Sequence, residues 1–205
     1  MNLELEFKLA VPHTALLEKI IFDEQVAQVR QGGYALLDMA TVYYDTPDRL
    51  LESRYCTLRL RQENDTLVAT LKTPAPGKAR HEYACPATDI RSALPLLVAE
   101  GAPEELMELL KDKPLQPVCA ARFTRRSADL RFADGTVCEL AADVGALAGG
   151  TREEALCELE LELKSGSADT VSAFAEELKE RFGLRDEPRS KFARAEALAK
   201  QEETP

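Results

Sequence analysis

The chain has 205 residues, of which 45% are hydrophobic and 30% charged, and its formal net charge is −10 at pH 7. This length suits one folded domain, predicted over residues 1–200, with a solvated tail at residues 201–205. The negative charge argues against a nucleic-acid or anionic-membrane binder, since those partners select exposed clusters of Lys and Arg. No apolar run approaches the roughly 20 residues of a membrane span, and the N-terminus lacks the layout of a signal peptide. We therefore expect a cytoplasmic protein.

The cysteines and histidines argue against several common kinds of site. The five cysteines are spread along the chain without a CxxC pair. That spacing excludes most zinc-finger patterns and provides no disulfide framework, so we interpret the cysteines as small apolar side chains. The two histidines, His13 and His81, stand in no nucleophile motif, which disfavours Cys-His and Ser-His-Asp chemistry.

Period-two alternation dominates the first half of the chain. Residues 3–9 place Glu4, Glu6 and Lys8 on one side and apolar residues on the other, which predicts a strand with two different faces. Residues 14–30 have the pattern of an amphipathic helix that ends at a pair of glycines. Further strands are predicted over residues 34–45, 55–62, 67–72 and 80–85.

The second half continues with two helical regions around a set of strands. Residues 89–112 look helical, with interruptions at Pro95 and Pro103. Strands are predicted over residues 118–132, 136–145 and 156–164, and helices over residues 168–182 and 190–201. About eight strands, mostly joined by hairpins, predict an α+β fold: a closed eight-stranded antiparallel β-barrel, or tunnel, with helices packed outside.

The charged faces of these strands are the feature that needs an explanation. For any single strand, a polar face turned to solvent is the ordinary interpretation. The same spacing recurs, however, on strand after strand, so we favour a barrel whose charged faces point inward, with room for one small ligand. The residues concerned are Glu4, Glu6, Lys8, Arg59, Arg61, Thr70, Lys72, Arg80, Glu82, Arg122, Arg126, Glu158, Glu160 and Glu162.

Clustered carboxylates require cations. Two carboxylates about 6 Å apart repel by roughly 3 kcal/mol at an effective dielectric constant of 20. The two acidic groups therefore predict a site for a hard divalent ion, Mg²⁺ or Mn²⁺, held by Glu4, Glu6, Glu158, Glu160 and Glu162. The opposite wall would be basic, and a basic wall beside a metal fits a polyphosphate group, since Arg forks match phosphate oxygens. The expected phosphate-binding residues are Lys8, Arg59, Arg61, Lys72, Arg80, Arg122, Arg126 and Lys191.

Several of these segments resemble a known family. Glu4-Leu5-Glu6-Phe7-Lys8 resembles the ExExK signature of the CYTH superfamily, the triphosphate tunnel metalloenzymes. The resemblance continues in family order through residues 43–48, 58–61, 71–72, 80–83, 143–145, 157–163 and 190–191. It implies an eight-stranded tunnel, a triphosphate bound by inward Lys and Arg, and Mg²⁺ or Mn²⁺ held by inward Glu.

Within the superfamily, the chain is most similar to bacterial CYTH-type inorganic triphosphatases, which often carry a helical, histidine-rich CHAD domain after the tunnel. The sequence leaves open whether this chain is a stand-alone version or an excised fragment. Oligomeric state, physiological substrate and preferred metal are also left open.

The expected reaction is in-line attack of water on a terminal phosphorus, with charge spread over phosphate oxygens. Lys8, Glu82 and Asp143 are the catalytic candidates; for Glu82 and Asp143, structural pairing with a neighbouring Arg is equally open. Alternatives on the same fold are a class IV-type adenylate cyclase and a thiamine triphosphatase. A non-catalytic polyphosphate-binding module and a purely structural barrel are alternatives of other classes, and the full set of inward Glu favours an enzyme.

Overall fold

The computed structural model describes residues 2–76 and 79–201. The strands within these residues are β1 (Asn2–Glu4), β2 (Glu6–Ala10), β3 (Ala35–Asp45), β4 (Thr57–Glu63), β5 (Thr66–Pro74), β6 (Arg80–Pro86), β7 (Gln116–Arg131), β8 (Val137–Gly149), β9 (Arg152–Ser165) and β10 (Arg185–Asp186). The helices are α1 (Thr14–Ile21), α2 (Glu24–Val29), α3 (Ile90–Ala99), α4 (Glu104–Lys111), α5 (Ala168–Phe182) and α6 (Lys191–Lys200), with one 3₁₀ turn at Glu52–Arg54. None of the helices in this described part is long and apolar enough to cross a bilayer.

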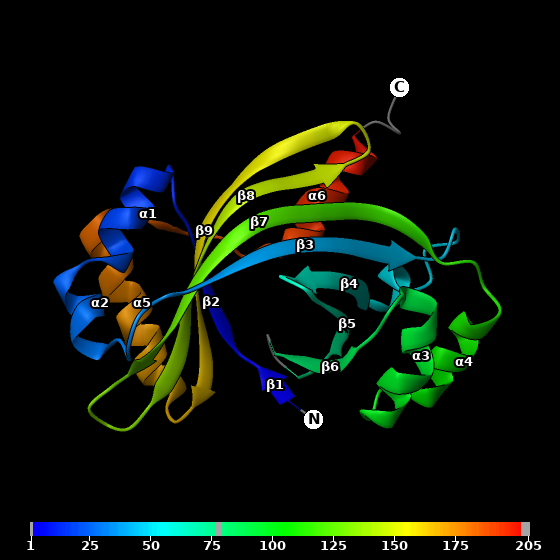
Figure 1. The fold of residues 1–205 in the computed structure, drawn as a ribbon, viewed down its shortest axis with the longest axis horizontal. Helices are drawn as coiled ribbons and strands as arrows, with labels where there is room; N and C mark the ends of the chain where they lie inside the picture. Colours follow the sequence, from blue (N-terminus) through cyan, green and yellow to red (C-terminus); the bar gives the residue numbers. More distant parts are fainter. Residues whose placement is uncertain (1, 77–78, 202–205) are drawn as a thin grey trace.

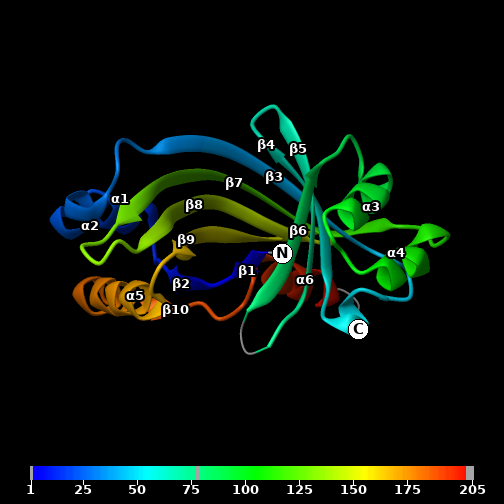
Figure 2. The same ribbon diagram turned by 90° about the horizontal axis from the view of Figure 1, so that it is seen from below.

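All strands belong to one antiparallel sheet, in the order β1-β6-β5-β4-β3-β7-β8-β9-β2-β10. β1 and β2 are two halves of the N-terminal strand, separated only by Leu5. β1 pairs with β6 and β2 pairs with β9, so this strand joins the two ends of the curved sheet (Figures 1 and 2). With β1 and β2 counted as one strand and the short β10 set aside, the ring has eight strands. The predicted α+β fold with an eight-stranded antiparallel barrel is confirmed.

Two groups of helices cover the outside of the barrel. α1, α2 and α5 pack against one end through a core that includes Leu9, Ile20, Leu140 and Leu178. α3 and α4 pack on β5 and β6 through a second core, which includes Leu71. These helices bury the apolar faces of the strands, and the predicted external position holds for all five of them.

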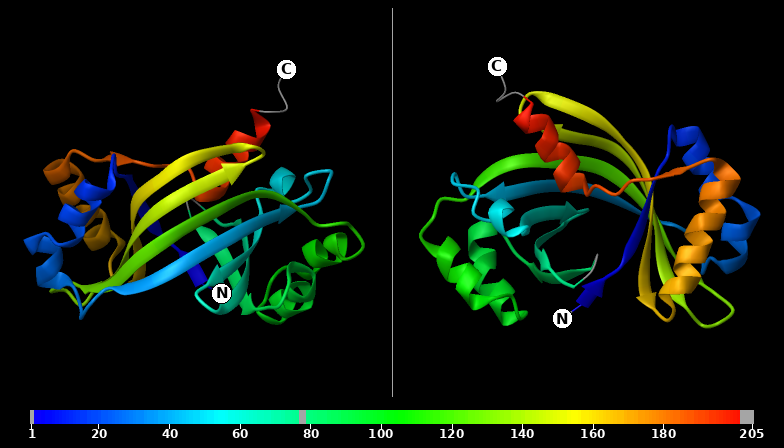
Figure 3. Two further views of the ribbon diagram at one scale, coloured as in Figure 1. Left: turned by 45° about the horizontal axis from the view of Figure 1, so that its top comes forward. Right: turned by 180° about the vertical axis from the view of Figure 1, so that it is seen from behind.

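The last helix, α6, is the exception because it lies against the inner face of β7, β8 and β9 (Figure 3). Its Ala195 is buried with Phe123 and Leu147 in a third core, which is completed by residues of β3 and by Phe192. Close approach requires a glycine on the sheet: a Cβ at Gly149 would lie 2.1 Å from the carbonyl oxygen of Ala195. The helix therefore fills part of the barrel interior.

The helix boundaries differ from the sequence prediction in two places. The helix predicted over residues 14–30 is divided into α1 and α2, because Asp23 begins a new helix by accepting a hydrogen bond from the backbone N–H of Gln25 at 3.0 Å. Pro95 lies inside α3 and does not end it. Pro103 immediately precedes α4, where its missing N–H costs no helical hydrogen bond.

The position of α6 can be tested with Gly149→Ala. The added methyl group meets backbone atoms of the helix, which cannot move independently, and overpacking of this kind costs roughly 1–3 kcal/mol. We expect a lower midpoint in thermal unfolding followed by circular dichroism. Gly33→Ala is the matched control, because no atom lies within 4 Å of a Cβ at that position. Equal midpoints for the two variants would contradict the contact between α6 and β8.

Candidate functional site

The strand register brings the charged faces of β2, β9, β8 and β7 together. Lys8 on β2 lies opposite Glu160 on β9, and Glu158 on β9 lies opposite Asp143 on β8. Asp143 in turn lies opposite Arg125 on β7. Residues directly opposite each other in a sheet have side chains on the same face. These side chains therefore share the inner face, the face on which α6 packs.

Three carboxylates form a buried cluster on this face. Ligand-type oxygens of Asp143, Glu158 and Glu160 lie within 4.8 Å of one another. Lys191, at the start of α6, contacts all three: its ammonium is 2.7 Å from Asp143, 2.8 Å from Glu160, and also bonded to Glu158. Arg125 donates to both carboxylate oxygens of Asp143, at 2.8 and 2.7 Å, and to Glu160 at 2.6 Å. The cluster is thus neutralised by cations from two different elements.

Burial and crowding shift the pKa values inside the cluster. Burial, together with the neighbouring Glu160, raises the pKa of Glu158 to about 7 despite its contact with Lys191. Burial would also raise the pKa of Glu160, but Lys191 and Arg125 hold it well below its usual range. Burial opposes the charge of Lys191, yet the carboxylates raise its pKa above the ordinary value. The ammonium therefore stays charged.

The cluster fits a divalent cation chemically. Its contacting atoms are carboxylate oxygens, the ligand type that Mg²⁺ and Mn²⁺ prefer. A cation bound there would share these oxygens with Lys191 and Arg125.

The opposite part of the inner face is basic. Arg59 and Arg61 of β4 lie opposite Tyr43 and Thr41 of β3, and Lys72 follows on β5. Arg61 is 6% exposed and donates to the Thr41 hydroxyl at 3.0 Å, with Glu63 at 3.7 Å. Burial, followed by the charge of Arg59, lowers the pKa of Arg61 to about 10. Such crowding of like charges favours an anion at this place.

On this basic part of the inner face, the Nε of Arg59 is buried and has no hydrogen-bond partner among the described residues. A buried donor without a partner is costly, and a phosphate oxygen would satisfy it. Lys72 is 2.9 Å from Glu82, whose pKa is lowered: burial would raise it, but Lys72 and Arg59 outweigh that effect.

The acidic and basic parts meet at Phe123. The guanidinium carbons of Arg61 and Arg125 both lie 5.8 Å from the centre of its ring, and the Lys191 ammonium lies 5.1 Å from it. Each distance is within the range of a cation–π interaction. The aromatic ring therefore separates the two parts of the inner face while stabilising cations on both sides.

Comparison with known proteins agrees with this geometry. The family model of the CYTH domain matches residues 2–195 of the sequence. The chain belongs to the CYTH family. It is 30% identical over 181 residues to an inorganic triphosphatase of Haemophilus influenzae, covering 85% of this chain and 49% of the relative. A Mycobacterium tuberculosis protein of uncharacterised function is 29% identical over 184 residues, covering 82% of this chain and 35% of the relative. This CYTH chain thus spans half or less of the length of these curated relatives.

Solved structures share the fold. A protein from Hippeastrum, described as an adenylyl cyclase candidate with a dominant triphosphatase activity, is 17% identical with a TM-score of 0.57, and the match covers 96% of each chain. An adenylate cyclase candidate from Bacillus halodurans is 20% identical with a TM-score of 0.56, covering 93% of this chain and 96% of that one. At these identities the likeness concerns the CYTH fold alone.

Two residues predicted to line the CYTH tunnel do not do so. Arg122 lies opposite Ala40 and Arg126 lies opposite Leu36, so both occupy the outer face of β7. Arg126 contacts Glu18 of α1 at 3.4 Å and its side chain is 40% exposed. The prediction that they face the tunnel is wrong. β7 has arginines at both even-numbered and odd-numbered positions, and the odd-numbered one, Arg125, is the one that faces inward.

Two inward cations were missed in the sequence. Arg125 is adjacent to the positions chosen, and the buried Phe123 two residues earlier is the signal that could have identified its face. Arg194 of α6 donates to Glu158 at 2.8 Å and to Glu154 at 2.6 Å. Its sequence spacing from Lys191 places both on one side of a helix, but the sequence alone did not place that helix inside the barrel.

The remaining predicted residues whose side chains the structure describes contact other protein groups. Lys8 contacts Glu6 at 3.0 Å; burial would lower its pKa, but Glu6 and Glu160 raise it. Glu162 is paired with Lys164 at 2.9 Å. Arg80 donates to the carbonyl of Tyr55 at 2.7 Å, so part of its guanidinium is bound to backbone. The side chain of Glu4 lies outside the described residues, and its backbone pairs with Arg80.

The importance of Lys191 can be measured with Lys191→Met. Removing the shared counter-charge from three buried carboxylates should cost roughly 3–5 kcal/mol of unfolding free energy. Without the ammonium, the carboxylate pKa values rise in the folded state, so this state takes up protons that the unfolded state does not bind. The loss should therefore be largest near pH 8 and shrink as the pH falls toward 5.

Urea denaturation at pH 8 and pH 5.5 measures this difference. Lys111→Met is the matched control, because that side chain is 65% exposed and its contact to Glu108 is 3.5 Å long. A Lys191→Met protein with the control's stability at pH 8 would contradict the role assigned to the ammonium.

Proposed function

We propose that this chain is a divalent-metal-dependent hydrolase that cleaves inorganic triphosphate into pyrophosphate and phosphate. The observation that carries the proposal is the meeting, on one inner face, of incompletely neutralised arginines with a buried carboxylate cluster. A ligand that suits both parts must be a dense anion that also binds a metal. The similarity to a relative named inorganic triphosphatase supports the same substrate class.

Arg59 and Arg61 are the principal phosphate-binding residues in this proposal. A guanidinium presents two parallel N–H groups that match two oxygens of one phosphate. Arg59 has hydrogen-bonding capacity that protein groups leave unused, since its Nε has no partner among the described residues. Lys72 and Lys8 supply further positive charge from neighbouring strands, each held in place by a carboxylate.

Asp143, Glu158 and Glu160 are the proposed metal ligands best supported by the geometry, with Glu4, Glu6 and Glu162 as further candidates. Mg²⁺ or Mn²⁺, when bound, supplies positive charge that stabilises the phosphate oxygens during transfer. Because burial raises the pKa of Glu158 to about 7, protons compete with a metal ion for this carboxylate. Metal binding at the proposed site should therefore weaken as the pH falls.

The proposed reaction is an in-line displacement at the terminal phosphorus. The oxygen of water forms a bond to that phosphorus, and the bond to the bridging oxygen breaks so that pyrophosphate leaves. The two protons of the water remain on the orthophosphate and pyrophosphate products. The protein forms no covalent bond to the substrate in this reaction. The fixed cations Arg59, Arg61 and Lys72 contribute by stabilising negative charge on the transferring group.

Glu82 acts in this proposal as a positioning residue, and Asp143, besides being a proposed metal ligand, also positions Arg125. Both oxygens of Asp143 accept hydrogen bonds from Arg125, and one also contacts Lys191. Glu82 is paired with Lys72 and has a lowered pKa, so it is a poor proton acceptor. Lys8 keeps its charge beside Glu6 and is better suited to binding a phosphate oxygen than to proton transfer.

Arg61→Ala tests the proposal with tripolyphosphate as substrate and Mg²⁺ or Mn²⁺ in the buffer. Loss of one preorganised cation should lower kcat/KM by roughly 10²-fold or more. Arg126→Ala is the matched control, since it removes an arginine from the outer face of the same sheet and should stay within about two-fold of the unchanged protein. Phosphate release by Arg61→Ala at the control's rate would contradict the proposed binding site.

The same assay separates the other activities found on this fold. The unchanged protein is incubated with tripolyphosphate, ATP and thiamine triphosphate, each with and without EDTA, and the products are identified. Preferential, EDTA-sensitive release of phosphate from tripolyphosphate is the expected result. Cyclic AMP formation, thiamine diphosphate as the preferred product, or binding without turnover would each replace the proposed activity with another one.

A further inference from the structure

The middle of the outer face of β3, β7, β8 and β9 is not covered by any helix of residues 2–76 and 79–201 (Figure 3). α6 packs on the other side of these strands. Val144 is 37% exposed and Leu36 is 61% exposed. The strand register places small apolar residues on this outer sheet face: Ala40, Val42, Ala120, Val144, Ala146, Ala148 and Ala155.

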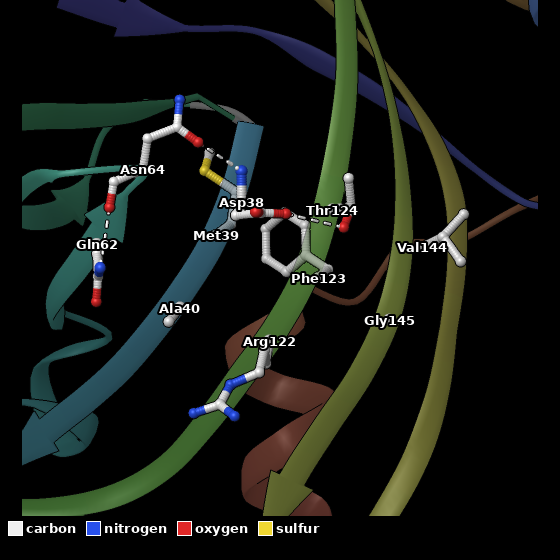
Figure 4. Close-up of a pocket in the computed structure, with 10 residues that line it drawn as sticks. All are labelled: Asp38, Met39, Ala40, Gln62, Asn64, Arg122, Phe123, Thr124, Val144 and Gly145. Carbon is white, nitrogen blue, oxygen red and sulfur yellow. Dashed lines mark hydrogen bonds between the residues drawn. The ribbon is translucent and has the colours of Figure 1, made fainter. Parts of the chain in front are cut away.

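A groove of about 450 Å³ lies on this face between β4, β3, β7 and β8 (Figure 4). Most of its polar groups satisfy one another: Thr124 donates to the Asp38 carboxylate at 3.2 Å, and the Asp38 N–H donates to the side chain of Asn64 at 2.9 Å. Gln62 donates to the carbonyl of Asn64 at 2.9 Å. Arg122 is exposed, and its guanidinium makes no hydrogen bond or ion pair with any residue that the structure describes.

The groove carries both signs of charge in a self-complementary arrangement. Ala40 lies opposite Arg122, and Asp38 lies opposite Thr124, so Asp38 and Arg122 are diagonal neighbours on adjacent strands. A two-fold axis that passes between them places Arg122 of one copy against Asp38 of a second copy, and does so twice. Self-complementarity of this kind is what an interface between identical subunits requires. The small side chains around the pair allow two sheets to approach to about 10 Å.

We propose that the outer sheet face forms a two-fold symmetric dimer, in which Arg122 pairs with Asp38 of a second copy. A second copy places a carboxylate beside the exposed guanidinium of Arg122 and covers the exposed Val144. The net charge of −10 opposes association at long range. This repulsion is largely screened at physiological salt, where the Debye length is about 8 Å. The proposal does not depend on the hydrolase activity.

Sedimentation velocity in 0.15 M salt, over about 5–100 µM protein, is the primary test. We expect the unchanged protein to have twice the mass of one chain at the upper end of this range. Arg122→Glu and Asp38→Arg should each weaken association at least ten-fold, because each places like charges together at both symmetry-related contacts. Val144→Asp should do the same by burying a carboxylate in the apolar part of the interface.

The decisive measurement is a mixture of the Arg122→Glu and Asp38→Arg proteins. In a mixed dimer, the carboxylate introduced at position 122 of the first variant faces the guanidinium introduced at position 38 of the second. The unchanged Asp38 of the first variant and the unchanged Arg122 of the second face each other at the symmetry-related contact. Association should therefore return to within a few-fold of the unchanged protein. Arg185→Glu, an exposed change on β10, is the control for charge alone and should leave the mass unchanged.

Three results would overturn the proposal. The first is a monomer throughout the range for the unchanged protein, which would mean that a second copy does not cover the face. The second is a dimer that persists in both Arg122→Glu and Val144→Asp. The third is a mixture of the two charge variants that stays monomeric while the unchanged protein dimerises and both variants keep its thermal midpoint.

Discussion

The contact of the Lys191 ammonium with three buried carboxylates is the interaction on which the interior of this protein depends. Charges removed from water are stable only when they are paired and hydrogen-bonded. Asp143, Glu158 and Glu160 come from two strands, and Lys191 comes from the last helix. The same ion pairs that make the acidic cluster tolerable therefore hold α6 inside the barrel. A change that weakens these ion pairs is therefore expected to destabilise both the carboxylate cluster and the packing of α6.

This arrangement divides the barrel interior into parts with different chemistry. Where α6 lies against the sheet, the inner face is apolar, and Phe123, Leu147 and Ala195 form a core. Next to it, the carboxylate cluster and the crowded arginines share the inner face on either side of the Phe123 ring. Along β7 the buried side of the sheet changes, since Phe123 is buried inward and Leu130 outward. Part of the barrel interior is therefore an apolar core, because α6 packs there against the inner face of the sheet.

Much of this was accessible from sequence, because alternation with period two is a property of the strand itself. The pattern around Glu6 and Lys8, and that around Glu158 and Glu160, predicted strands with one charged face, and their agreement across distant segments predicted a shared interior. The pattern could not predict which side of β7 faces inward, because Arg122, Arg125 and Arg126 occupy both even-numbered and odd-numbered positions. The inward side is fixed by the pairing of Arg125 with Asp143, which depends on the register between β7 and β8. The inner position of α6 likewise depends on a close approach at Gly149 that no local pattern encodes.

A triphosphate bound between the arginines of β4 and the carboxylates of β8 and β9 is the arrangement on which the proposed function depends. A crystal structure of the protein soaked with tripolyphosphate and Mn²⁺ would test this most directly, since anomalous scattering locates the metal independently of the phosphates. We expect phosphate oxygens within hydrogen-bonding distance of Arg59 and Arg61, and Mn²⁺ bound by at least two of Asp143, Glu158 and Glu160. Well-ordered tripolyphosphate bound only to the outer face, with the inner arginines still without an anion, would contradict it.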